Sequence, residues 1–267
     1  MVRLKQNSDF MEYVEYKSRD RIGYITINRP EKRNALSDGL VQELKDALAL
    51  AERDESVKVI VLQARGDVFC SGADLAYLQE MQNNSYEKNL ADSEHLKDLF
   101  YQIYTLDKVV IASVQGHALA GGCGLATVCD FSFAVPHAQF GYTEVRIGFI
   151  PAIVMVFLLR KIGEGKARQL LLQGDTLTAE QAKQFRLINE IVPAEELETR
   201  VYEFARKLIT SNSANSMRLT KKMIAELHSM SLSDALDYAA KMNADARGSE
   251  DCKKGIASFL RKERIIW

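Results

Sequence analysis

The stretch VVIASVQGHALAGGCGLATVCDFSFAV, residues 109–135, decides the fold class. Residues 109–114 are apolar and rich in β-branched side chains, which is typical of a buried strand. A glycine cluster at residues 116–124 follows and leads into a short helical run. Residues 131–135 then return to a strand pattern. A strand, a turn, a helix and a second strand in this order predict an α/β layer architecture with largely parallel strands.

The same alternation extends toward the N-terminus. Strands are expected at residues 11–17, 22–27 and 57–62. Apolar residues recur at helical spacing from Leu40 to Ala51, with Ser37 as a plausible N-cap. A more polar helix is expected at residues 86–106. The first part of the chain is therefore predicted to be one α/β unit.

The last part of the chain has a different pattern. Helical periodicity recurs in four blocks, at residues 194–210, 214–228, 232–246 and 255–264. We therefore expect two regions, an α/β core over residues 1–194 and a helical region over residues 195–267.

Composition excludes several classes of function. The 267 residues carry a net charge of -1, which gives no general attraction to nucleic acid or to an anionic membrane. Residues 1–10 are polar and lack a secretory signal. The longest apolar stretch, residues 147–159, is interrupted by Gly148 and Pro151 and is shorter than the ~20 residues that cross a bilayer. A soluble, cytoplasmic protein is expected.

The metal-ligating residues form no motif. The four cysteines contain no CxxC pair, and the four histidines contain no HExxH. We therefore expect no metal site and reduced, mostly buried thiols.

The glycine cluster is the first candidate site. Glycines at a strand-to-helix turn let the backbone approach a ligand, and the first amides of the helix have no partner within it. Such amides suit an anion or a developing oxyanion. The alternative is a tight turn without a ligand, which we favour for a glycine cluster taken alone.

Nucleotide-binding motifs are absent or incomplete. There is no GxxxxGK[ST], and Gly122-Cys123-Gly124 lacks a third glycine because Thr127 occupies its position. Glu144, 20 residues after Gly124, keeps a dinucleotide site formally open. The turn at residues 69–75 is not a GxSxG elbow, which makes Ser71 a poor hydrolase nucleophile.

Several motifs in order resemble the enoyl-CoA hydratase/isomerase (crotonase) superfamily. They lie at residues 28–36, 69–75, 116–124, 138–144 and 259–262. Together they run through nearly the whole chain. The resemblance implies a crotonase-like spiral of ββα units, with C-terminal helices that assemble trimers, commonly paired as hexamers. It also implies an acyl-CoA substrate, with coenzyme A as part of that substrate and no other cofactor.

The same resemblance implies specific roles. The backbone amides of Ala73 and Gly121 would bind the thioester oxygen as an enolate forms, and Glu144 would transfer protons. A further set of residues is expected to bind the substrate: Lys32, Arg33, Ala35, Ser71, Gly72, Asp74, Leu75, Gly122, Gly124, Tyr142, Phe259 and Lys262. Lys262 is expected to contact a phosphate of coenzyme A.

The chain also departs from the family pattern. Gly124 stands where two-glutamate hydratases have their second glutamate, and Ala76 stands where a lysine is common. We expect Gly124→Glu to be tolerated by the fold. Bulky residues at 152–156 should reshape the acyl pocket. The segment 141–159 most resembles methylglutaconyl-CoA hydratases.

These patterns favour the reversible hydration of a 2-enoyl-CoA. An enoyl-CoA double-bond isomerase is the alternative, because a single glutamate suffices for that reaction. From another class, the chain could be a CoA-binding structural trimer with little turnover.

Overall fold

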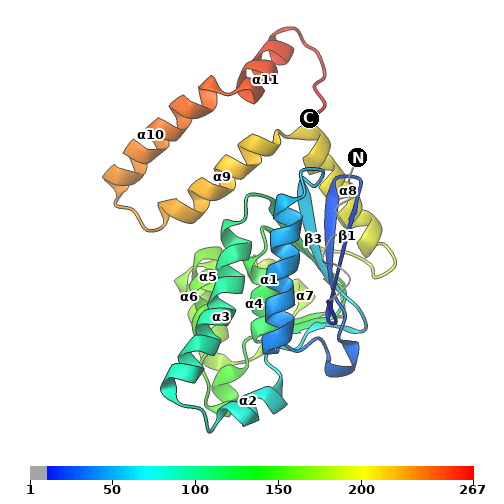
Figure 1. Cartoon of the computed structure of the whole chain (residues 1–267), viewed down its shortest axis with the longest axis vertical. Coiled ribbons are helices and arrows are strands. Elements are labelled where there is room, and N and C mark those ends of the chain that lie inside the picture. Colours follow the sequence, from blue (N-terminus) through cyan, green and yellow to red (C-terminus); the bar gives the residue numbers. More distant parts are fainter. Residues whose placement is uncertain (1–10) are drawn as a thin grey trace.

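Two β-sheets form the centre of the molecule (Figure 1), which is a computed structural model that describes residues 11–267. The larger sheet has the order β1-β2-β3-β5-β7-β10 and the smaller sheet β4-β6-β8-β9. The strands of the larger sheet are β1 (Val14–Arg19), β2 (Ile22–Ile27), β3 (Val59–Ala64), β5 (Val109–Val114), β7 (Phe131–Ala134) and β10 (Glu190–Ile191). Those of the smaller sheet are β4 (Val68–Cys70), β6 (His117–Leu119), β8 (Gln139–Gly141) and β9 (Thr176–Thr178).

Each repeating unit places one strand in each sheet and then forms a helix. The first unit is β3-β4 followed by α2 (Leu75–Met81) and α3 (Tyr86–Thr105). The second is β5-β6 followed by α4 (Gly121–Val128). The third is β7-β8 followed by the 3-10 turn η3 (Glu144–Ile147) and α5 (Ala152–Ile162). This succession confirms the expected spiral of ββα units.

The predicted parallel pairing is also confirmed. Strands β2, β3, β5 and β7 pair in parallel, and all six residues of β5 are buried. Helix α1 (Asp38–Arg53) buries the apolar stripe read from the sequence, and its N-cap Ser37 accepts a hydrogen bond from the Leu40 amide. Antiparallel pairing in the described residues is confined to β1-β2 and β8-β9.

Three short strands were not predicted. The sequence indicated turns where β4 and β6 lie, and it gave no strand pattern for β9. Each of these strands has three residues. Three residues are too few for a two-residue alternation to be distinguished from a turn.

The remaining helices cover the core or project from it. Helices α6 (Glu164–Gln173) and α7 (Ala179–Gln184) belong to the body of the molecule. Helix α8 (Leu197–Ser211) buries four apolar residues against the larger sheet. Helices α9 (Ala214–Leu227), α10 (Leu232–Gly248) and α11 (Glu250–Leu260) extend beyond it (Figure 1). The division expected at residue 195 stays a prediction.

The projecting helices are tied back to the core by polar contacts. Lys221 of α9 is 7% exposed and pairs with Asp130 at 2.7 Å. At the chain end, the carbonyl of Trp267 accepts a hydrogen bond from Arg21, 3.0 Å away. Across residues 11–267, no helix is long and apolar enough to cross a membrane. The expectation about residues 1–10 lies outside the described residues.

The smaller sheet and α4 meet with no space for a side chain at Gly122. A Cβ atom added there would lie 2.1 Å from the carbonyl oxygen of Cys70 in β4. Since that oxygen belongs to the backbone, it cannot move aside alone. Glycine at this position therefore sets the distance between the start of α4 and the smaller sheet.

We predict that Gly122→Ala lowers the free energy of unfolding by about 3 kcal/mol, because the added methyl group forces α4 away from β4. Gly165→Ala on α6 is the matched control, since a Cβ atom there meets nothing within 4 Å. The control should leave stability unchanged or raise it by up to about 1 kcal/mol. Urea denaturation of both variants checks this, and equal effects would refute the packing argument.

Candidate active site

Three neighbouring strands of the smaller sheet end at the same edge. Strand β6 pairs in parallel with β4 on one side and with β8 on the other. The carboxyl ends of parallel strands meet at one edge of a sheet, where α/β folds commonly bind ligands. The segments that leave this edge carry Ala73, Gly121 and Glu144 respectively. The three residues expected to be catalytic are thus brought together by one pairing pattern.

The Ala73 amide points away from Leu36, the residue that pairs with it in an isolated β-bridge. Ala73 forms an isolated parallel bridge with Leu36, through the Leu36 amide to the Gly72 carbonyl (2.7 Å) and the Asp74 amide to the Leu36 carbonyl (2.9 Å). Because these bonds use the groups on either side of Ala73, its own N–H faces the opposite direction. Within residues 11–267 that amide donates to no protein acceptor. It is therefore available to a ligand.

The Gly121 amide lies at the first residue of α4. Amides in the first turn of a helix have no acceptor inside that helix, and the helix dipole makes this end positive. Gly72 has φ +92°, and a Cβ atom built on it would lie 3.4 Å from the Gly121 nitrogen. The loops that carry the Ala73 and Gly121 amides are therefore in direct contact.

Ala120, just before Gly121, has an unusual backbone. Its φ of 49° lies in the left-handed region, which costs a non-glycine residue of order 1–3 kcal/mol. Its amide donates to the Gly141 carbonyl at the end of β8, at 2.7 Å. This bond fixes the start of α4 relative to the strand that leads to Glu144. Strain of this kind is concentrated at functional sites.

Glu144 begins η3, three residues after β8 ends. The residue is only 9% exposed, and its Oε2 atom has no hydrogen-bond partner in the described part of the chain. Burial raises the pKa of the Glu144 carboxyl, and the hydrogen bond from its own amide offsets this only in part. A buried carboxylate with an unpaired oxygen and a raised pKa is suited to accept and return a proton.

A polar network holds the Ala73 loop in place, and sequence analysis did not single it out. Arg29 pairs with Asp74 at 3.0 Å, with both side chains largely buried. Asn34, fully buried, accepts from the Arg29 amide and donates to the carbonyls of Arg65 and Val68. Both residues lie in the motif at 28–36, but a single sequence does not distinguish such supporting residues from ligand contacts.

Known proteins share both the sequence pattern and the fold of this chain. The sequence profile of the enoyl-CoA hydratase/isomerase family matches residues 17–267. The mitochondrial enoyl-CoA hydratase of Pongo abelii is 35% identical over 257 residues, which cover 95% of this chain and 87% of that protein. The chain belongs to the enoyl-CoA hydratase/isomerase family.

Two further relatives agree. Crotonyl-CoA hydratase of Syntrophomonas wolfei is 32% identical, over 95% of this chain and 96% of the relative. The crystal structure of an enoyl-CoA hydratase from Shewanella pealeana matches with a TM-score of 0.91 at 27% identity, over 97% of both chains. The protein is thus an enzyme of the hydratase/isomerase family with the crotonase fold.

Within this family fold, Gly124 has a role different from the one expected. It is buried in α4, and a Cβ atom added there would lie 2.3 Å from Val154 Cγ1 and 2.9 Å from Phe100 Cε1. The expectation that the fold tolerates Gly124→Glu was therefore wrong, because both side chains would have to move. Val154 belongs to the bulky segment 152–156, which was expected to reshape the acyl pocket.

Three other predicted ligand contacts have structural partners instead. Tyr142 is fully buried, and its hydroxyl lies 3.0 Å from that of Thr127, so its ring is enclosed by the core. Asp74 is occupied by Arg29 and by the Ala76 amide that it caps. Gly122 packs on β4. As contacts of a bound substrate, these three positions stay predictions.

The other expected substrate-binding residues fall in two places. Lys32 and Arg33 are exposed, Ala35 is buried, and Ser71 is half-buried. Their segments meet in space, because the Ser71 amide donates to the Arg33 carbonyl at 3.2 Å. The side chain of Leu75 lies outside the described part of the structure. Phe259 lies near the end of α11 and Lys262 just after it, and α11 is at the opposite end of the molecule from α2 (Figure 1). Within one chain they are not brought to Ala73.

Cysteines and metal ligands contribute little to this site. Cys70, Cys123 and Cys129 are buried and unpaired, and burial raises the pKa of each thiol to about 12. Such thiols are unreactive at neutral pH. The described residues contain no group of three or more side chains that could hold a metal ion.

We predict that Asp74→Asn lowers the free energy of unfolding by about 1–3 kcal/mol at pH 7. Burial alone would raise the pKa of Asp74, but hydrogen bonds from Arg29 and the Ala76 amide lower it overall. A lowered carboxyl pKa stabilises the fold above the unfolded value of ~3.9, and that stabilisation is lost as pH falls. The difference between wild type and variant should therefore shrink below about pH 4. Urea titrations at several pH values test this, and a difference independent of pH would refute it.

Proposed function

We propose that this enzyme catalyses the reversible addition of water to the double bond of a 2-enoyl-CoA. The observation that carries the proposal is the buried Glu144 carboxylate, whose Oε2 atom has no partner among residues 11–267, at the same sheet edge as the Ala73 and Gly121 amides. The names of the relatives, enoyl-CoA and crotonyl-CoA hydratases, support the same reaction. The proposed chemistry needs no cofactor beyond the coenzyme A of the substrate.

In the proposed mechanism, the Ala73 and Gly121 amides bind the thioester oxygen. Addition at C3 turns the thioester into an enolate, whose negative charge develops on that oxygen. Amides fixed in advance stabilise this charge, and one such donor is typically worth about 3 kcal/mol. The positive end of α4 favours the same charge.

Glu144 handles the protons. Its carboxylate accepts a proton from water while the water oxygen bonds to C3, and the resulting acid then donates a proton to C2. The sum is addition of H and OH across the double bond, with Glu144 returned to its charged form. A pKa raised by burial makes Glu144 a stronger base when charged and helps it exchange protons near neutral pH.

A double-bond isomerase is the second candidate, and Gly124 is the observation that favours it. Val154 and Phe100 fill the space that a side chain at position 124 would need, which leaves Glu144 without a neighbouring carboxylate from that position. One glutamate suffices to take a proton from C2 of a 3-enoyl-CoA and return one to C4. Incubation with 2-enoyl-CoA and 3-enoyl-CoA thioesters separates the two by mass, because only hydration adds water.

The acyl group and the assembly are finer parts of the proposal. Methylglutaconyl-CoA should be included in the panel, because residues 141–159 resemble hydratases of that substrate. The proposed assembly is a trimer or a pair of trimers formed through the C-terminal helices. Exposed apolar residues on those helices support it: Leu232, Leu236, Ile256, Phe259 and Leu260.

We predict that Glu144→Gln reduces kcat at least 100-fold while acyl-CoA binding is retained. Glutamine keeps the shape of glutamate but cannot accept a proton at neutral pH. Steady-state kinetics and calorimetric binding of a saturated acyl-CoA measure the two effects. More than about a tenth of the wild-type rate would contradict the proton-transfer role.

The same variant should be more stable than wild type at pH 7, by roughly 0.5–2 kcal/mol. A carboxyl pKa that folding raises means that the charged form opposes folding, so wild-type stability increases as pH falls through the raised pKa. Glutamine has no charge at any of these pH values. The gap between the two proteins should close toward pH 4, and a less stable variant at pH 7 would contradict this account of Glu144.

We predict that Lys262→Ala weakens binding of CoA thioesters about 10-fold and leaves binding of a pantetheine thioester unchanged. The latter lacks the 3′-phosphate that an ammonium group would contact. Lys241→Ala on α10 is the control, since it removes an exposed lysine at a different place on the same helical extension. Equal weakening of both ligands would show that Lys262 acts through assembly or folding.

A further inference from the structure

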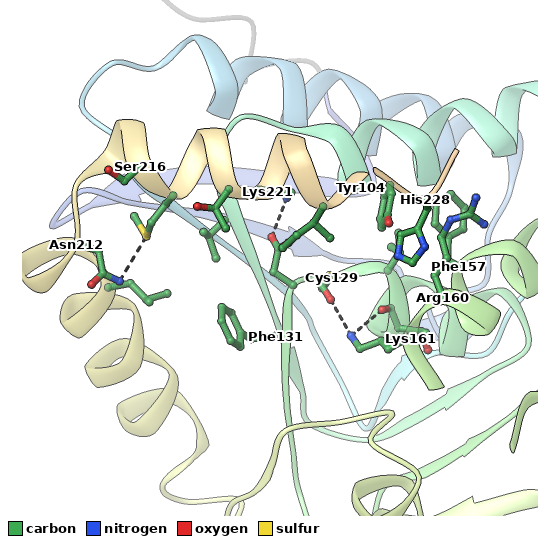
Figure 2. A pocket seen from close by; sticks show the side chains of 18 of the residues that line it. Tyr104, Cys129, Phe131, Phe157, Arg160, Lys161, Asn212, Ser216, Lys221 and His228 are labelled. Carbon is green, nitrogen blue, oxygen red and sulfur yellow. Dashed lines mark hydrogen bonds and ion pairs between the residues drawn. The ribbon is translucent and has the colours of Figure 1, made fainter. Parts of the chain in front are cut away.

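A cavity lies between α9 and the core, apart from the candidate active site. Its volume is about 650 Å³, within the range typical of small-molecule sites. Residues from α5, α8 and α9 and from the segment after α4 line it (Figure 2). No residue of the candidate active site is among them.

The walls of this cavity are mainly apolar. The apolar lining residues are Val109, Val128, Phe131, Phe157, Leu208, Met217, Ile224 and Trp267. Phe131 stands in the middle of the cavity wall in Figure 2, below α9. Such a surface suits a hydrocarbon chain better than a polar metabolite, because burying apolar area is favourable while polar groups would lose water contacts.

The charges that line the cavity are unbalanced. The lining side chains include the cations Arg160, Lys161 and Lys221, but only one carboxylate side chain, that of Asp130. Lys221 pairs with that carboxylate at 2.7 Å. In the described chain, Arg160 and Lys161 form no ion pair. Two adjacent residues of α5 thus leave excess positive charge at an apolar cavity.

Lys161 is held at the cavity wall by the end of α4. Its ammonium group donates to the carbonyls of Thr127 and Cys129, at 2.7 and 2.8 Å (Figure 2). An ammonium group has three donors, so one remains. Burial lowers the pKa of Lys161, and the neighbouring Cys129 and Asp130 offset this only in part. An anion in the cavity would stabilise the charged form.

Arg160 is the second cationic residue of α5 that can bind an anion in this cavity. Its Nη1 atom donates to the Val156 carbonyl of the same helix, which leaves most of its five donors free. Guanidinium groups bind carboxylates through two parallel hydrogen bonds. We propose that this cavity binds a single-chain fatty carboxylate, with the carboxylate beside Arg160 and Lys161 and the hydrocarbon chain along the apolar wall.

The chain contains one tryptophan, Trp267, and it lines this cavity. Its fluorescence therefore reports occupancy directly. Titration with decanoate should give a saturable change with one site per chain. Decanol, which lacks the charge, and decyltrimethylammonium, which has the opposite charge, should bind at least 10-fold more weakly.

Substitutions in the cavity wall test whether decanoate binds in this cavity. Arg160→Met should weaken decanoate binding at least 10-fold and reduce the preference over decanol. Arg168→Met is the matched control, because Arg168 lies on α6, pairs with Glu164 and does not line the cavity. Thr220→Phe, which places a ring at the cavity wall from α9, should weaken decanoate and decanol alike.

Four results would overturn the proposal. Equal affinity for the three amphiphiles would show an apolar surface without anion recognition. Displacement of decanoate by acetyl-CoA would place it in the candidate active site. Unchanged binding in both Arg160→Met and Thr220→Phe would place it elsewhere. Absence of binding together with a change in sedimentation of Arg160→Met would show that a second copy of the chain covers this surface.

Discussion

The parallel pairing of β4, β6 and β8 is the constraint on which the candidate active site depends. Each strand is only three residues long, so the pairing alone does little for stability. Its effect is positional, because three chain segments leave one edge within contact distance. Gly72 and Gly122 make this possible by leaving no side chain between α4 and the loop after β4. The larger sheet and the surrounding helices then hold this small sheet in place.

The local geometry at this edge opposes stability at several points. Ala120 has a backbone conformation that disfavours alanine, and Glu144 is buried as a carboxylate with an unpaired oxygen. Within residues 11–267, the Ala73 and Gly121 amides likewise donate to no protein acceptor. Each feature lowers the stability of the fold, which a loop without a function would gain nothing from. Together they are typical of an active site, where local stability is lower and the rest of the fold keeps the reactive groups in position.

The sequence predicted the long elements well, because α1, β5 and the C-terminal helices have many residues over which a period can be detected. It also predicted the ββα spiral, through the family resemblance of ordered motifs. It did not reveal β4, β6 and β9, which are too short to show a period. It did indicate that Asp74 could cap the next helix, as it does for α2, but not its pairing with Arg29 or the contact between Tyr142 and Thr127, since those partners come from distant parts of the chain. The cavity beneath α9 is likewise assembled from segments far apart in sequence.

The contact between Gly124 and Val154 has a consequence for how such enzymes diverge. A side chain at position 124 requires space that Val154 Cγ1, and to a lesser extent Phe100 Cε1, now occupies, so positions 124 and 154 cannot change independently. A lineage that acquires a larger residue at 124 must first shorten the residue at 154, and the reverse order passes through an unstable intermediate. The two positions should therefore covary across descendants, and the order of the two substitutions should be the same in each lineage that makes the exchange.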